Sequence, residues 1–298
     1  MRLSRRNIVF FFLAFLALLA ALALLAAALL VRLGTSRPER PLPVLMYHHV
    51  VPDGEDCNDM TVTASRLRAD LRWLEDNGYT TVLPRELAEG KDLPEKPVLV
   101  TFDDGYRSNY ELAFPILQEL RAKAAISVMV FMQDRCADDF ITWAMCREMT
   151  DSGLVEIGSH TYLCHNLGER QGHFEPGGVN GVQRDPAESD AAFQTRVLDD
   201  IQLSYDLIAE HTGRAPALFA YPFGLRDPEA DQLIRELFPV SAVTYPWTAD
   251  LAQGLHALPR YTVTMDRTPE ELLNPPLFFR LKTGAKILLG RETVPAQS

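Results

Sequence analysis

The sequence predicts an α/β barrel of parallel strands, preceded by a single membrane-spanning helix. Three observations lead to this prediction. Short β-branched runs alternate with segments of helical apolar spacing between Val44 and Thr264, as βαβ units require. Two adjacent acids, Asp103 and Asp104, end one of these runs, at the kind of position where α/β barrels carry their chemistry. An unbroken apolar run, Ile8 to Val31, stands before the whole pattern.

The apolar run at the N-terminus is long enough to cross a membrane. About 20 residues span a bilayer, whereas a signal-peptide core needs about 7–15. The run has no polar residue on any face, which argues against a buried core helix. We therefore expect residues 1–33 to be an uncleaved signal anchor, residues 34–42 a stiff, proline-containing linker, and residues 43–298 one globular domain. A cleavage site in the alanine-rich middle of the run stays open as the alternative.

The composition limits the classes of partner. The chain has 298 residues, of which 47% are hydrophobic and 23% charged, as in an ordinary globular protein. Its net charge of −11 argues against a nucleic-acid partner, because nucleic acids bind to basic faces. Of the four cysteines, Cys136 and Cys146 could close a loop in an oxidising compartment, but the sequence assigns no pairing.

Predicted strands are short runs rich in β-branched residues and bounded by turn residues. The clearest is Val98–Phe102, which follows Pro94 and Pro97 and is apolar on both faces. The predicted strands are Val44–Val50, Tyr79–Leu83, Val98–Phe102, Ala124–Phe131, Leu154–Gly158, Ala217–Tyr221, Val240–Thr244 and Leu258–Thr264.

Helices are predicted where apolar residues recur at helical spacing. In Thr63–Asn77 these residues are Leu67, Leu71 and Leu74, and Gly78 follows as a C-cap. The other predicted helices are Arg85–Glu89, Asn109–Leu120, Trp143–Ser152, Ala192–Thr212, Pro228–Phe238 and Leu277–Leu289.

The segment Asn166–Asp190 interrupts this alternation of strands and helices. It is rich in glycine and has almost no apolar periodicity. A loop of this length in a compact domain is either functional or disordered. Because it begins directly after a candidate site residue, His165, a groove wall and a disordered loop both remain open.

Asp103 and Asp104 are the first candidate site. Taken alone, an Asp-Asp-Gly sequence is more often a helix N-cap followed by a turn glycine. A second cluster changes this interpretation, because His160 and His165 follow another predicted strand. Zn²⁺ binds neutral imidazoles and carboxylate oxygens, and a catalytic site leaves one position open for water. Asp104, His160 and His165 would supply three ligands, whereas the neighbouring Cys164 is expected to pack or stay free.

The motifs resemble those of the polysaccharide deacetylase family, also called the NodB homology domain or carbohydrate esterase family 4. Thr101–Gly105 (TFDDG) matches the family's first motif. Ser159–His165 (SHTYLCH) is similar to the second motif, in the wider-spaced form of the enzymes that deacetylate poly-β-1,6-N-acetylglucosamine. Phe219–Gly224 (FAYPFG) resembles the third. The resemblance extends from about Pro43 to Asp266 and implies the distorted (β/α) barrel of the NodB type.

This resemblance implies a site and an activity. Asp104, His160 and His165 would hold a divalent metal, with zinc expected, Asp103 would be the general base, and the backbone N–H of Phe223 would bind the oxyanion. The activity implied is metal-dependent removal of N-acetyl groups from an extracytoplasmic N-acetylglucosamine polymer, by a domain tethered to the membrane. Peptidoglycan, an O-acetylated glycan and a non-catalytic glycan-binding role remain alternatives. Nothing in the sequence indicates a protein partner.

Two departures from the family pattern concern proton transfer. Ala220 stands where many members have an arginine, and Arg260 stands where many have the histidine that protonates the leaving amine. The proton donor is therefore unassigned, although Asp103 could return the proton that it takes. A direct role for His48 or His49 is also left open. From the sequence alone, Asp103→Asn is expected to keep both the metal and the fold.

Overall fold

The computed structural model describes residues 5–135, 138–165, 179–294 and 297. The chain divides into two compact units, one formed by the N-terminal segment to Arg37 with Asn274–Val294, the other centred on Pro38–Leu273. The last residues of the expected linker, Pro41 and Leu42, form a short strand that belongs to the second unit.

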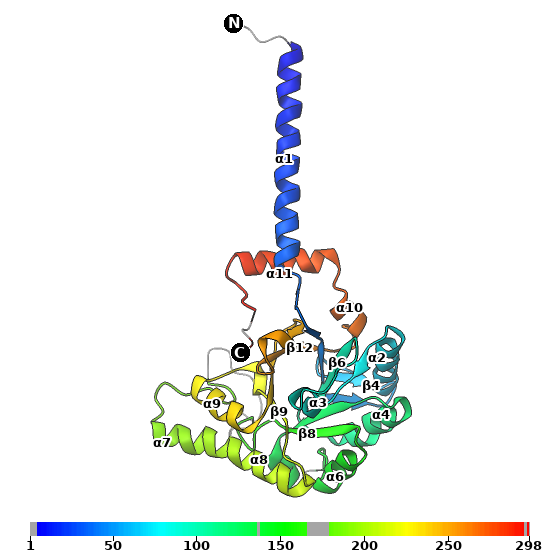
Figure 1. The fold of residues 1–298 in the computed structure, drawn as a ribbon, viewed down its shortest axis with the longest axis vertical. Coiled ribbons are helices and arrows are strands. Elements are labelled where there is room, and N and C mark those ends of the chain that lie inside the picture. Colours follow the sequence, from blue (N-terminus) through cyan, green and yellow to red (C-terminus); the bar gives the residue numbers. More distant parts are fainter. Residues whose placement is uncertain (1–4, 136–137, 166–178, 295–296, 298) are drawn as a thin grey trace. The chain divides into compact units, whose positions relative to one another are not determined.

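A closed barrel of parallel strands forms the second unit (Figure 1). Among the described residues, seven strands follow one another in hydrogen-bonded order and the last pairs with the first. In this order they are β2 (Val44–Tyr47), β6 (Pro97–Phe102), β7 (Ala124–Val128), β8 (Val155–Ser159), β9 (Leu218–Ala220), β10 (Val240–Thr244) and β12 (Leu258–Thr262). The predicted α/β barrel is confirmed.

Short strands outside the barrel complete the sheets. β5 (Thr80–Thr81) pairs in parallel with the first two residues of β6, Pro97 and Val98. β1 (Pro41–Leu42) pairs antiparallel with β11 (Ala249–Asp250), and β3 (His49–Val51) pairs with β4 (Thr61–Thr63).

Helices surround the barrel in the order that βαβ connections impose (Figure 1). Thr63 caps the first of them by accepting a hydrogen bond from the Arg66 N–H, and Thr142 caps α6 in the same way. These helices are α2 (Ala64–Asp76), α3 (Pro84–Ala88), α4 (Phe114–Leu120), α5 (Val130–Asp134), α6 (Trp143–Asp151), α7 (Asp190–Phe193), α8 (Asp199–Thr212), α9 (Pro228–Leu237) and α10 (Pro269–Leu273). Single π-helical or 3₁₀ turns lie at Asn109–Ala113, Gln194–Leu198, Pro222–Gly224 and Leu251–Gln253.

Two of the predicted strands run on into a separate element. The first ends at Tyr47 and a separate strand, β3, begins at His49, because β3 leaves the barrel to pair with β4. The strand predicted to Phe131 ends at Val128, and the helix α5 follows. In α5 the N–H groups of Val130 and Phe131 donate to carbonyls of the loop after β8 rather than to a neighbouring strand. Both differences arise from contacts between segments that are distant in sequence.

The register places the ends of neighbouring strands at one level. Tyr47 of β2 is paired with Phe102 of β6, so His48 and Asp103 follow side by side. Val128 of β7 is paired with Ser159 of β8, so His160 begins the adjacent loop. Because all these strands are parallel, the polar residues that follow them gather at the carboxyl ends of the barrel strands.

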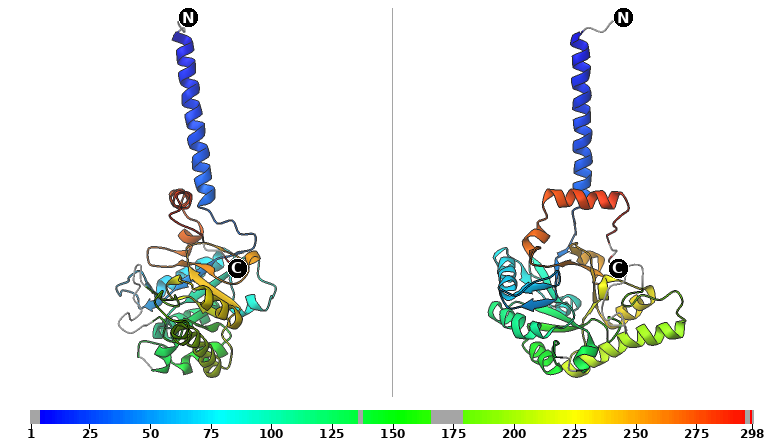
Figure 2. Two further views of the ribbon diagram at one scale, coloured as in Figure 1. Left: turned by 90° about the vertical axis from the view of Figure 1, so that its left-hand side faces the viewer. Right: turned by 180° about the vertical axis from the view of Figure 1, so that it is seen from behind.

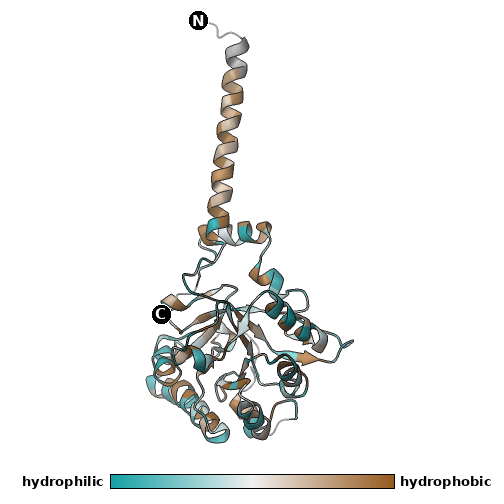
Figure 3. Cartoon of the chain, turned by 45° about the vertical axis from the view of Figure 1, so that its right-hand side comes forward, coloured by the Kyte–Doolittle hydropathy of each residue, from teal (hydrophilic) through white to brown (hydrophobic). Residues whose placement is uncertain are grey.

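The first unit contains two helices, α1 (Arg5–Leu33) and α11 (Leu277–Leu288). Within α1, Phe10–Leu33 is 24 residues long with a mean hydropathy of 2.9, long and apolar enough to cross a membrane. Figure 3 shows α1 as apolar along most of its length. No other described helix meets this criterion.

Candidate metal and catalytic site

The end of β6 turns sharply at the two acids. The N–H of Asp103 continues the ladder by donating to the Tyr47 carbonyl (3.0 Å). Asp104 then takes a left-handed conformation (φ 73°), and so does Gly105 (φ 77°). A side chain at Gly105 would place its Cβ 2.8 Å from a methyl carbon of Val128, so glycine is required. The turn separates two adjacent carboxylates into different surroundings.

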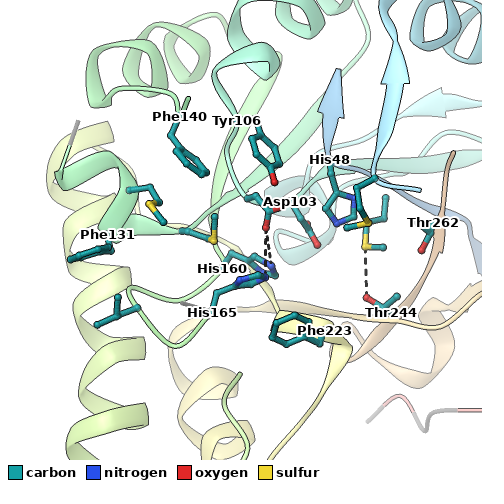
Figure 4. Close-up of a pocket in the computed structure, with 16 residues that line it drawn as sticks. His48, Asp103, Tyr106, Phe131, Phe140, His160, His165, Phe223, Thr244 and Thr262 are labelled. Atoms are coloured by element: carbon teal, nitrogen blue, oxygen red, sulfur yellow. Dashed lines mark hydrogen bonds and ion pairs between the residues drawn. The ribbon is translucent and has the colours of Figure 1, made fainter. Parts of the chain in front are cut away.

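The three predicted metal ligands meet in space. Nε2 of His160 and Nε2 of His165 each lie 3.7 Å from Oδ1 of Asp104. One ligand atom from each of the three residues lies within 4.8 Å of the other two. Figure 4 shows the two imidazoles side by side, with dashed lines for their contacts to the carboxylate.

The protonation states of the three candidate ligands are compatible with binding a cation. Nδ1 of His160 lies 2.7 Å from the Ala220 carbonyl, which can only accept, so Nδ1 carries the proton and Nε2 presents its lone pair. Burial lowers the pKa of His165 to about 4, which keeps that ring neutral. Oδ1 of Asp104 is buried and accepts no hydrogen bond within the described part of the chain. A buried carboxylate oxygen needs a partner, and a cation bound there would provide one.

Hydrogen bonds fix the loop that carries the two histidines. Ser159 accepts from the Thr161 N–H (3.1 Å), and the Thr161 hydroxyl accepts from the His165 N–H (3.2 Å). The carboxylate of Asp200, on α8, accepts from the N–H groups of Tyr162 (2.9 Å) and Leu163 (2.6 Å). The positions of both imidazoles therefore depend on a carboxylate that touches neither of them.

Asp103 is bound by an arginine rather than by the histidines. Arg260 of β12 donates from Nη1 and Nη2 to the two oxygens of Asp103, each at 2.7 Å. Its Nη1 also donates to the Thr101 hydroxyl (3.2 Å). Arg260 is 0% and Asp103 2% exposed. Burial alone would raise the pKa of Asp103, but the guanidinium, with His160 and His48, holds that pKa well below its usual range.

The turn after β9 brings Phe223 to the site. The Phe223 ring packs on the His165 ring, with centroids 4.7 Å apart. Its backbone is left-handed (φ 59°), as are those of Asp104 and Thr161 (φ 72°). Non-glycine residues rarely adopt this conformation, at a cost of about 1–3 kcal/mol each, and such strain clusters at functional sites. Here three residues of one site share the left-handed conformation.

These residues open into a cleft of about 960 Å³. Its walls combine the candidate ligands with methionine and aromatic side chains, among them Met129, Phe131 and Phe140 (Figure 4). The Phe140 ring stacks on Tyr106 at 5.4 Å, and Tyr106 packs on His49 at 4.9 Å. A largely apolar cleft with a few convergent polar groups is the usual form of a small-molecule or glycan site.

The structure brings all the predicted site residues, Asp103, Asp104, His160, His165 and Phe223, to this cleft. His48, whose role was left open, also lines it, and burial lowers its pKa. Cys164 lies outside the ligand cluster and donates to the Arg196 carbonyl (3.0 Å). Cys146 is a free, buried cysteine, whereas Cys136 lies outside the described residues. Most of the loop expected to be a groove wall or disordered, 166–178, also lies outside them.

Three residues that contact or line the candidate site escaped the sequence analysis. Arg260 was noted only as the absence of a histidine, and Tyr106 and Asp200 were not considered. One signal for Arg260 was available, because an arginine inside a predicted barrel strand needs a buried counterion. No comparable signal existed for Asp200, whose role depends on how α8 packs against the histidine loop.

The barrel and the cleft define a class, an α/β barrel with a candidate metal centre at the carboxyl ends of its strands, beside an arginine-bound carboxylate. A model of the family described as "Polysaccharide deacetylase" matches residues 90–238. The Bacillus subtilis protein named "Putative polysaccharide deacetylase YxkH" is 30% identical over 237 residues, covering 77% of this chain and 74% of that protein. The chain belongs to the polysaccharide deacetylase family.

Two further proteins are similar to this chain. Poly-β-1,6-N-acetyl-D-glucosamine N-deacetylase of Escherichia coli is 28% identical over 273 residues, covering 84% of this chain. The match spans only 41% of the length of that enzyme. Among solved structures, IcaB from Ammonifex degensii superposes with a TM-score of 0.63 at 25% identity, covering 83% of this chain and 100% of that one.

Proposed function

We propose that the chain is a metal-dependent N-deacetylase of an extracytoplasmic polysaccharide containing N-acetylglucosamine, anchored to the membrane by α1. The observation that carries this proposal is the cluster of Asp104, His160 and His165 in a cleft that also contains the arginine-bound Asp103. A polysaccharide deacetylase that had lost catalysis would have no reason to retain all four of these residues in this arrangement.

Asp104, His160 and His165 would hold the metal, for which zinc is the expected ion. Three protein ligands of this kind leave a coordination position for water or substrate, as in catalytic zinc sites. A divalent cation in such a site supplies Lewis-acid polarisation of a carbonyl and a lowered pKa for water. The hydrogen bond from Nδ1 of His160 to the Ala220 carbonyl orients the first imidazole for this task.

Asp103 would move the proton. As the attacking water adds to the acetyl carbon, Asp103 accepts the proton that the water loses. The C–N bond then breaks, and the amine nitrogen takes a proton, so the products are acetate and a free amino sugar. The two hydrogen bonds from Arg260 keep Asp103 ionised, which is the form a base requires, and Asp103 returns the proton to the leaving nitrogen. The backbone N–H of Phe223 would stabilise the oxyanion.

Poly-β-1,6-N-acetylglucosamine is the substrate that we infer. The support comes from the E. coli relative, whose name states this activity, and from the spacing of the two histidines. The aromatic and methionine walls of the cleft offer apolar surfaces against which sugar rings could pack. The extracytoplasmic location is inferred from the resemblance to the polysaccharide deacetylase family.

Metal analysis and acetate release test the proposal together. The full chain, purified in detergent, should contain about one divalent cation and release acetate from poly-β-1,6-N-acetylglucosamine oligomers faster than from chito-oligosaccharides, peptidoglycan or acetylated xylan. His160→Ala should lose both metal and acetate release. His211→Ala is the matched control, because His211 stacks on Trp143 at 4.4 Å and does not line the cleft. Faster release from another polymer would reassign the substrate, and glycan binding without acetate release would indicate a non-catalytic module.

A further inference from the structure

The helix α11 carries an unusual set of exposed apolar side chains. In the described residues, exposed large hydrophobic side chains are concentrated on α1 and at α11, and only Met60, Leu203, Met265 and Val294 lie elsewhere. Such a concentration on a water-soluble surface marks an interaction site. At α11 these side chains, each 56–68% exposed, are Leu277, Phe278, Phe279, Leu288 and Leu289.

Two glycines bring α11 into backbone contact with the C-terminal end of α1. A Cβ at Gly284 of α11 would lie 1.8 Å from the Leu30 carbonyl oxygen, and a Cβ at Gly34 would lie 1.9 Å from the Arg280 carbonyl oxygen. Only glycine permits so close an approach of two backbones. Figures 1 and 2 show α11 running across this end of α1. The contact fixes α11 at the level where the apolar run ends, at Leu33.

The charges of α11 have one sign. Arg280, Lys282 and Lys286 lie within Leu277–Leu288, which contains no Asp or Glu, although the whole chain has a net charge of −11. At 3.6 residues per turn, Leu277 and Leu288 lie within about 20° of each other around the helix axis and about 160–180° from Lys286, whereas Phe279 lies on the side of Lys286. Figure 3 shows apolar and hydrophilic segments alternating along α11, as expected of an amphipathic helix. A basic amphipathic helix suits the surface of an anionic bilayer.

We propose that α11 lies in the headgroup region of an anionic phospholipid bilayer, beside the point where α1 leaves the membrane. Its apolar side contacts the acyl chains and its basic side faces the lipid phosphates, where Lys282 is exposed and Lys286 also pairs with Glu292 (3.0 Å). This proposal rests on the proposed anchoring by α1, because the glycine contact sets the depth of α11. The close contact between α1 and α11 sets the direction in which the exposed apolar side chains of α11 point relative to α1. The two helices can therefore bind the same membrane, α1 across it and α11 at its surface.

Site-specific fluorescence in vesicles tests the position of α11. In the full chain with Cys57 and Cys136 replaced by serine, a single cysteine is introduced as Leu288→Cys, Lys286→Cys or Leu19→Cys and labelled with a polarity-sensitive dye. The chain is reconstituted in phosphatidylcholine with phosphatidylglycerol, and spin-labelled lipids serve as quenchers. We expect several-fold stronger quenching at position 288 than at position 286. Equal and weak quenching at these two positions would overturn the proposal.

The label at position 19 separates the two proposals. Quenching at 19 without quenching at 288 refutes the role of α11 and leaves the anchor intact, whereas no quenching at 19 refutes the anchor itself. Shielding of the 288 label without lipid quenching, accompanied by cross-links between two chains, would assign α11 to a second copy and also refute the membrane contact.

Charge reversal tests the anionic component. With the label at 288, Lys282→Glu combined with Lys286→Glu should reduce the quenching several-fold in vesicles containing phosphatidylglycerol. Lys91→Glu is the control, since Lys91 is an exposed lysine that pairs with Glu89 outside α11. Quenching that does not change on charge reversal, or when phosphatidylglycerol is omitted, would overturn the assignment to an anionic surface.

Discussion

Two buried carboxylates in the barrel unit are each bound to an arginine, yet their environments act in opposite directions. Asp103, at the cleft, accepts two hydrogen bonds of 2.7 Å from the fully buried Arg260. Asp70, on α2, accepts one bond of 2.6 Å from Nε of Arg66 and one of 3.1 Å from the Tyr47 hydroxyl. Asp70 is also buried, at 4% exposure.

The pKa values of the two acids diverge. At Asp103 the guanidinium outweighs burial and lowers the pKa. At Asp70 burial outweighs its arginine and tyrosine partners and raises the pKa to about 6. An Asp–Arg pair is therefore not enough to keep a carboxylate ionised. At the site, the bidentate pair with Arg260, reinforced by neighbouring histidines, keeps Asp103 ionised. At α2, the pair with Arg66 leaves Asp70 able to bind a proton at mildly acidic pH.

The largest expected difference between the two acids is in turnover. Asp103→Asn should reduce acetate release by about 10²–10⁴-fold, the usual contribution of a positioned base. Asp70→Asn should leave turnover nearly unchanged, because Asp70 does not line the cleft. Acetate release per bound metal ion, measured on both variants, checks this. Comparable losses in the two variants would show that Asp103 acts through the fold rather than on the substrate.

The next difference is in stability. Arg260→Met leaves Asp103 buried and unpaired, and breaking a buried pair costs about 3–5 kcal/mol. Arg66→Met should cost less, because Asp70 can take up a proton instead of remaining an unpaired charge. Urea unfolding followed by tryptophan fluorescence measures both changes.

The double variant Asp103→Asn with Arg260→Met controls for the loss of fold. Removing both charges should restore most of the stability that either single change loses, while acetate release stays low. Additive losses of stability would mean that the two side chains are not energetically coupled. Recovery of turnover in the double variant would remove Asp103 from the proton-transfer step.

This cycle also tests the expectation from the sequence alone that Asp103→Asn keeps the fold, because Asp103 is paired with Arg260 in the barrel. The motif predicted which side chains would cluster, Asp104, His160 and His165, because their residue types and order are those of a metal site. It could not predict the Asp103–Arg260 pair, whose members are 157 residues apart and meet only when the barrel closes. An ion pair of this kind is set by the order of strands around the barrel, which local sequence does not encode.

The fold shows the same difference between what local sequence predicts and what contacts between distant segments determine. The alternation of strands and helices was predictable from apolar spacing, as at β6 and α2. The break after Tyr47 was not, because β3 is defined by its pairing with β4. The helix α5 was also missed, because its first N–H groups bond to Thr161 and Tyr162 of a distant loop. Local pattern predicts the elements, whereas contacts between distant segments determine where several of them end.

The two acids should also respond oppositely to pH. The folded pKa of Asp70, about 6, is above the value of about 3.9 expected in the unfolded chain, so the folded state holds the proton longer. Asp70 should therefore lower stability by about 2 kcal/mol as the pH rises from about 4 to about 7. Asp103, with its lowered pKa, should instead add stability as the pH rises toward 4.

Unfolding free energies of the wild type and Asp70→Asn at pH 4 and pH 7 isolate the contribution of Asp70. The advantage of the wild type over the variant should decrease as the pH increases. A constant difference between them would show that Asp70 stays ionised in the fold, and the two acids would then be alike.

The smallest effect should come from Tyr47→Phe, which removes the hydroxyl that donates to Asp70. The loss of one hydrogen bond costs about 1 kcal/mol when the acceptor is neutral and about 2 kcal/mol when it is charged. Because Asp70 is protonated at pH 4 and ionised at pH 7, the cost should be greater at pH 7. The pKa of Asp70 should also rise further, since one donor to the ionised form is lost. Turnover should not change, because neither side chain lines the cleft.

Urea unfolding at the two pH values measures the cost of losing the Tyr47 hydroxyl. An equal cost at both would mean that the tyrosine stabilises the barrel by packing, through its ring stacked 5.4 Å from Phe102, and not through the charge of Asp70.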